Sequence, residues 1–134
     1  TNLITAGFLR PVSGPCVKDL LYEIAALTIA QVPSGIGFTK AVHTATGRLA
    51  QHCTPLEARF AGQVTHAAEG LTRKDADPIV RSLVDKYKDH QKAVNPGKPF
   101  TAAYDLETLQ PSLEWQGIYD EVCKEIEDEF GLSV

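Results

Sequence analysis

The clearest pattern of hydrophobic and polar positions lies in residues 54–71. Apolar residues recur there three or four positions apart, as on one face of a helix: Leu56, Phe60, Val64, Ala67, Ala68 and Leu71. Thr54 and Glu57 have the spacing of a capping box, and Pro55 suits the first helical position. Ala58, Ala61 and Gly62 are small enough to let a neighbouring backbone approach closely. The pattern predicts a helix that is covered on more than one side and organises the rest of the chain.

A second helix is predicted for residues 16–30, where apolar positions again repeat at helical spacing. We expect Ser13 to cap this helix and Glu23 to lie on its polar face. Residues 37–45 follow a glycine-flanked turn and alternate as in a strand. We expect this segment to be the one strand of the chain.

Two more helices are predicted in the second half of the chain. Thr72 and Asp75 form a second capping box, and apolar positions continue at helical spacing to residue 87. Ser112 and Gly131 are suitable start and stop residues for a last helix over residues 113–130, with Leu113 on its apolar side and a solvated acidic face that includes Glu125. Residues 100–110 are expected to form an extended or loosely turned arm.

Composition narrows the class of protein. The 134 residues are 43% apolar and carry a net charge of −4, which fits one ordinary globular domain or a piece of a larger one. The acidic balance argues against a nucleic-acid partner, and no apolar run reaches the roughly 18 residues of a membrane span. The three widely spaced cysteines form no CxxC pair, which favours reduced thiols in a cytoplasm. The histidines have no metal-site spacing.

Four segments carry a resemblance to a known family. They are SGPC at residues 13–16, TPLEARFAGQV at 54–64, NPGKPFTAAYDLETLQP at 95–111 and IEDEFGL at 126–132. Together they resemble the C-terminal region of the pyrrolysine-containing monomethylamine:corrinoid methyltransferases, over about residues 11–134. The resemblance implies an α/β fold: the C-terminal part of a (β/α)8 TIM barrel plus a helical extension, mostly α within this chain. Residues 1–53 would hold the last barrel strand with its helix elements, and residues 54–134 the C-terminal helices.

Candidate site residues follow from that fold. Chemistry on such barrels sits at the carboxyl ends of the strands, here after Leu9 and after Val42. Phe8, Arg10 and His43 are therefore candidates for a rim that meets the substrate or the corrinoid partner, although packing alone would also explain His43. Lys40 on the same predicted strand is a weaker candidate.

Two positions depart from the resembled family. Its members carry a glutamine and a tyrosine beside the pyrrolysine, just before the GPC motif, where this sequence has Phe8 and Arg10. This change alters the hydrogen-bonding support of the site and puts monomethylamine in doubt as the substrate. Arg10 could instead bind an anionic group or the corrinoid partner, because a guanidinium suits bidentate contacts.

The resemblance also implies the function. The whole enzyme would transfer a methyl group from a methylated amine to a corrinoid protein in methanogenesis, with pyrrolysine holding the amine. No position here is pyrrolysine and the chain does not begin with Met, so we expect a segment of a longer protein with no catalytic residue and no bound metal or cofactor of its own. It would supply scaffold, rim and oligomer surface to a cytoplasmic homo-oligomer whose partner protein carries the corrinoid. Two alternatives remain: a free-standing helical interaction domain without catalysis, and a pyrrolysine-free barrel relative that demethylates another compound.

Overall fold

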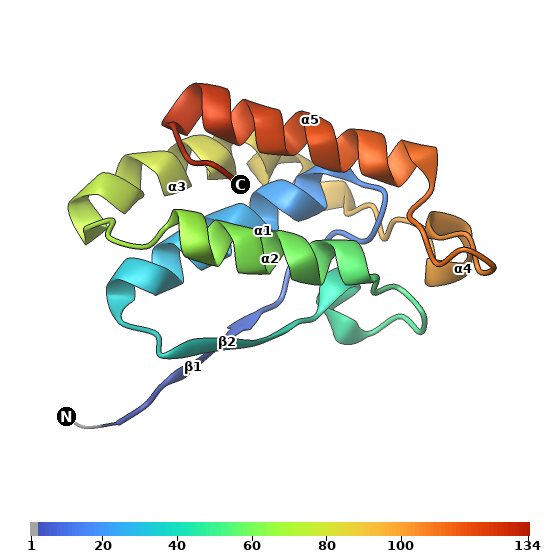
Figure 1. The fold of residues 1–134 in the computed structure, drawn as a ribbon, viewed down its shortest axis with the longest axis horizontal. Helices are drawn as coiled ribbons and strands as arrows, with labels where there is room; N and C mark the ends of the chain where they lie inside the picture. Colours follow the sequence, from blue (N-terminus) through green and yellow to red (C-terminus); the bar gives the residue numbers. More distant parts are fainter. Residues whose placement is uncertain (1–2) are drawn as a thin grey trace.

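The computed structural model describes residues 3–134 and shows three layers (Figure 1). A two-stranded sheet lies under α1 and α2, and α3 and α5 lie beyond these two helices. The elements are β1 (Ala6–Leu9), α1 (Lys18–Gln31), η1 (Val32–Ser34), β2 (Phe38–Val42), η2 (Thr44–Gly47), α2 (Pro55–Ala67), α3 (Arg73–Tyr87), η3 (Lys88–Ala93), α4 (Phe100–Ala103) and α5 (Leu113–Phe130).

The expectation of a single strand was wrong, because the described residues form two strands. β1 pairs in parallel with β2, and α1 makes the connection between them. The hydrophobic pattern does not reveal β1, because its four residues include only two large apolar side chains, one of which, Leu9, is fully buried. Only the family resemblance implied a strand end at Leu9. The predicted strand also ends early, at Val42, because the chain then turns into η2. No helix within residues 3–134 covers the opposite face of this sheet (Figure 1).

The organising helix is confirmed as α2. Its capping box is formed, with Glu57 accepting from both the backbone N–H and the hydroxyl of Thr54. Trp115 on α5 donates its indole N–H to the same hydroxyl oxygen at 3.1 Å. Phe60 and Val64 are fully buried. Because the cap itself is packed under α5, the start of α2 is fixed by both local and distant contacts.

The start of α1 differs from the prediction. The helix begins at Lys18, with Val17 in the capping position and no side-chain cap. Ser13 instead donates its hydroxyl to Glu23 at 2.6 Å, and Glu23 also accepts the backbone N–H of Val12 at 2.5 Å. Glu23 is therefore buried rather than on a polar face, because its carboxylate satisfies the donors of the turn after β1.

The last two predicted helices are confirmed with two corrections. Ser112 caps α5 and Gly131 ends it in a left-handed conformation, but Leu113, the first residue of the helix, is 94% exposed and not part of its apolar side. The expected arm at residues 100–110 begins with the short helix α4. It then turns at Asp105, whose carboxylate accepts two following backbone N–H groups.

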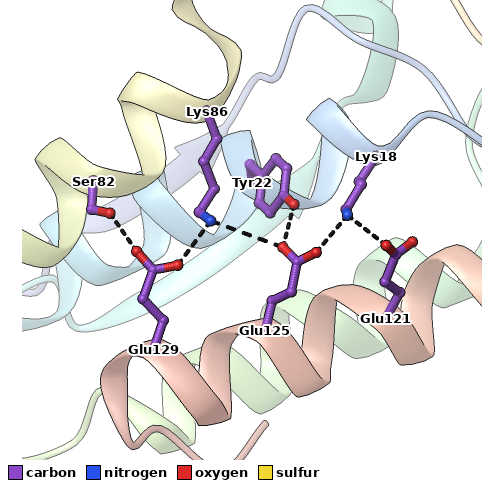
Figure 2. A network of polar contacts seen from close by, with 7 residues as sticks. All are labelled: Lys18, Tyr22, Ser82, Lys86, Glu121, Glu125 and Glu129. Atoms are coloured by element: carbon purple, nitrogen blue, oxygen red, sulfur yellow. Dashed lines mark hydrogen bonds and ion pairs between the residues drawn. The ribbon is translucent and has the colours of Figure 1, made fainter.

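The acidic face of α5 is not simply solvated (Figure 2). Glu125 accepts from Lys18 at 2.5 Å and from the Tyr22 hydroxyl, both on α1. Glu129 accepts from Lys86 and Ser82 on α3 at 2.8 and 2.6 Å, and Glu121 pairs with Lys18 at 2.9 Å. This network of seven residues joins α5 to both α1 and α3. Because its members are partly exposed, each ion pair contributes modestly.

Candidate functional site

The predicted site residues converge at the carboxyl ends of the two strands. The rings of Phe8 and His43 lie edge to face with centroids 5.7 Å apart. The Arg10 guanidinium carbon lies 5.8 Å from the centroid of the Phe8 ring. Phe8 is 42% exposed, so the cluster opens to the uncovered face of the sheet. β1 and its following residue thus supply two members, and the residue after β2 supplies the third.

Lys40 on β2 joins the same cluster, beside a β-bulge. Gly7 pairs with Thr39 but Phe8 pairs with Ala41, which leaves Lys40 as the extra residue of β2. Lys40 is exposed like Phe38 two positions before it, so regular alternation places it on the same side of the sheet as Phe8. The Lys40 ammonium lies 5.1 Å from the centroid of the Phe8 ring. The cluster therefore holds one aromatic ring with two cationic side chains against it.

Gln31 at the end of α1 accompanies the bulge. Its side-chain N–H donates to the Phe8 carbonyl at 3.1 Å. The glutamine fits because Gly7 has no side chain: a Cβ at Gly7 would lie only 2.1 Å from the Gln31 amide oxygen. The α1 helix thus holds the strand at the position that sets the direction of Phe8.

The loop after β2 is locked to the loop after β1. The backbone N–H groups of His43, Ala45 and Thr46 donate to carbonyls of Leu9, Ser13 and Pro11, at 2.8, 2.9 and 2.9 Å. Ala45 and Thr46 have positive φ values of 48° and 58°. Non-glycine residues are held in this region only where surrounding contacts determine it, often at functional sites. The two loops therefore act as one rigid support for the Phe8 cluster.

The turn after β1 is also packed against a distant segment. A Cβ at Gly14 would lie 1.7 Å from the Pro96 carbonyl oxygen, and one at Gly97 would lie 2.1 Å from the Pro15 carbonyl oxygen. The Gly14 N–H donates to the Asn95 carbonyl at 3.2 Å. Two of the segments that carry the sequence resemblance, 13–16 and 95–111, thus meet backbone to backbone.

Other candidate groups do not form a site. Burial raises the pKa of the Cys16 thiol to about 11, so this residue is not the activated thiol that a helix start can produce. His66 is exposed, and His90 pairs with Asp19 at 2.8 Å. Within residues 3–134 no three histidine, cysteine or acidic side chains converge as metal ligands. A pocket of about 180 Å³ between α1 and α3, with Arg73 and other residues in its wall, contains none of the predicted site residues.

Comparisons with known proteins identify the family. The family described as monomethylamine methyltransferase MtmB matches residues 1–132. Monomethylamine methyltransferase MtmB of Methanosarcina mazei is 30% identical over 96% of this chain and 28% of its own length. MtmB2 of Methanosarcina acetivorans is 31% identical over 98% of this chain and 29% of its own length. This chain thus spans less than a third of the length of these relatives.

Solved structures give the same result. The crystal structure of the Methanosarcina barkeri monomethylamine methyltransferase matches all of this chain and 29% of the crystallised chain, with a TM-score of 0.93 and 30% identity. A hydroxylamine complex of MtmB matches equally well. These matches confirm the predicted fold class, the C-terminal part of a (β/α)8 barrel with a helical extension. The chain belongs to the monomethylamine methyltransferase MtmB family.

Proposed function

We propose that this chain forms the scaffold, rim and oligomer surface of a methyltransferase that moves a methyl group from a methylated amine to a corrinoid protein. Family membership supports the reaction class. The observation that carries the proposal is the convergence of Phe8, Arg10 and His43 at the carboxyl ends of the strands. Barrel enzymes place their chemistry at that face.

The residues of this chain act by binding and positioning. Phe8 offers an apolar surface to a methyl group, while Arg10 and Lys40 supply fixed charge beside it. In the reaction the N–CH3 bond of the protonated donor breaks, the amine leaves with the bonding pair, and the carbon bonds to the partner's Co(I) through that metal's electron pair. The group that activates the amine, pyrrolysine in the resembled family, has no counterpart in this sequence. Residues 1–53 would therefore form the rim, and residues 54–134 would support it.

The proposed oligomer surface lies around the α4–α5 connection. Leu106, Leu109 and Leu113 are exposed there by 56%, 64% and 94%. Exposed apolar side chains in one segment favour burial against another subunit. We propose a homo-oligomer that works in the cytoplasm beside its corrinoid protein. No helix of the described residues 3–134 is long and apolar enough to cross a membrane.

The test is methyl transfer by the polypeptide that carries this chain. A donor labelled in its methyl carbon is incubated with the reduced corrinoid protein, and label on that protein is measured. Arg10→Ala should lower the rate at least tenfold without changing the melting temperature, because Arg10 makes no ion pair within the described residues.

The matched control is Glu127→Ala on the exposed side of α5, which should leave both rate and melting temperature unchanged. Glu125 is unsuitable as the control, because it joins α5 to α1. Equal rates for Arg10→Ala and Glu127→Ala would remove Arg10 from the rim. Absence of label on the corrinoid protein with every methylated amine would contradict the proposed reaction.

A further inference from the structure

We infer that the cluster around Phe8 binds an anionic group, and that the methyl donor is an N-methylated amino acid rather than a simple methylamine. The donor assignment rests on the proposed function, whereas the anion site rests on geometry alone. Two cationic side chains, Arg10 and Lys40, approach the Phe8 ring.

The cluster gathers positive charge on a chain that is acidic overall. The chain is acidic overall, with 17 acidic residues against 13 lysines and arginines. Within residues 3–134 five of those cations, Lys18, Arg81, Lys86, Lys88 and Lys98, form ion pairs with carboxylates. Arg10 and Lys40 are among the eight that form no ion pair within these residues, and both lie against the Phe8 ring. An anion bound beside the Phe8 ring would be attracted by both cations, which lie 5.8 and 5.1 Å from the ring centroid.

The backbone around the cluster is held in place by contacts from other parts of the chain. Lys40 follows Phe38 in regular alternation on the exposed side of β2, whereas Val42, beyond the bulge, pairs with the buried Leu9 and packs against the core. Gln31 and the interlocked loops fix the strand positions that carry Phe8 and Arg10. An arginine held in this way can make a bidentate contact with a carboxylate, and a lysine adds a point charge. The arrangement suits a small carboxylate over an apolar surface.

The cluster should also disfavour a ligand that carries only a positive charge. A methylammonium ion is positive at neutral pH, and an exposed aromatic ring would ordinarily attract it through its π face. Here Arg10 and Lys40 already lie against the Phe8 ring and repel a third cation. An N-methylated amino acid carries the same methylated nitrogen together with a carboxylate that the two cations can bind. The carboxylate therefore decides between the two classes of donor.

N-methylglycine and monomethylamine are a matched pair of probes, because N-methylglycine is monomethylamine with an added carboxymethyl group. We expect the polypeptide that carries this chain to bind N-methylglycine at least tenfold more tightly by calorimetry. Arg10→Gln and Lys40→Gln should each weaken that binding by about 10- to 100-fold, the range for a hydrogen bond to a charged group. Lys40→Arg should retain most of it.

Lys124→Gln on the exposed side of α5 removes the same charge away from the cluster and should change binding less than twofold. Circular dichroism melts establish that every variant is folded. Equal binding of the two probes, or equal losses in Lys40→Gln and Lys124→Gln, would overturn the inference. So would an Arg10→Gln variant that loses affinity for the corrinoid protein but binds N-methylglycine normally.

The two proposals fail in different ways. If the polypeptide demethylates monomethylamine and Arg10→Gln has no effect on it, the donor inference is overturned and the proposed reaction stands. If N-methylglycine binds in an Arg10-dependent manner but no methyl group reaches the corrinoid protein, the anion site stands and the proposed reaction is overturned. Transfer from N-methylglycine that is lost in both Arg10→Gln and Lys40→Gln supports both.

Discussion

Gly14→Ala tests whether the loops around the site are supported by the distant segment at residues 95–98. The change adds a single methyl group. Its carbon would lie 1.7 Å from the Pro96 carbonyl oxygen and 2.4 Å from the carbonyl carbon. Both atoms belong to the backbone, so no side-chain rotation relieves the overlap. The two segments must move apart.

The expected loss of stability follows from the hydrogen bonds that this movement would break. The Gly14 N–H to Asn95 carbonyl bond of 3.2 Å and the Lys98 N–H to Pro15 carbonyl bond of 2.9 Å join the segments. Losing them costs about 1 kcal/mol each, and residual overpacking costs about 1–3 kcal/mol. The reduced entropy of the unfolded alanine chain offsets about 0.4–1 kcal/mol. The expected loss in the free energy of unfolding is about 2–4 kcal/mol.

Urea unfolding of the full chain measures this loss through the transition midpoint. The control is Gly117→Ala within α5, where a Cβ meets no atom within 4 Å. Because alanine is the better helix former, that variant should be more stable by about 0.5–1 kcal/mol. A Gly14→Ala midpoint within about 0.5 kcal/mol of wild type would refute the close backbone packing of the two segments.

Three other predictions concern stability. Phe60→Ala should cost about 3–5 kcal/mol because the ring is fully buried, and exposed His66→Ala less than about 0.5 kcal/mol; urea midpoints in the reverse order would contradict the packing of α2. Burial raises the pKa of Glu23, so its stabilisation is complete below the pH where an unfolded glutamate titrates and is lost as pH rises through the folded value. The melting-temperature advantage of wild type over Glu23→Gln should therefore shrink as pH rises above the ordinary pKa of a glutamate, and a widening gap would disprove it. Glu125→Ala should cost about 1 kcal/mol more than Glu127→Ala at low salt, with the difference reduced in 1 M salt; a salt-independent difference would rule out the ionic network.

Local signals made the helices predictable. The capping boxes at Thr54 and Thr72 need only residues three positions away, so the sequence contains the complete hydrogen-bonding unit. Ser112 and Gly131 mark the two ends of α5 in the same local way. The hydrophobic pattern did not reveal β1, because that strand depends on pairing with residues 38–42, more than 30 positions away, and its end at Leu9 was expected only from the family resemblance.

The site was predictable in part. Phe8, Arg10 and His43 were placed together because the resemblance put both strand ends on one face. Lys40 was not placed with them, because its contact with Phe8 depends on how the two strands pair. The hydrophobic pattern places Glu23 on the polar face of its helix. Its burial depends on the backbone N–H that Val12 donates from the turn after β1. Long-range geometry of this kind has no periodic signature in the chain.

The most direct test of the central claim is to find where a carboxylate binds. The polypeptide that carries this chain is labelled with ¹⁵N and titrated with N-methylglycine, and backbone amide shifts are followed by NMR. The account predicts saturable shifts at residues 8–10 and 40–43, absent in Arg10→Gln and absent when monomethylamine replaces N-methylglycine. Shifts that centre instead on the pocket between α1 and α3, beside Arg73, would contradict it.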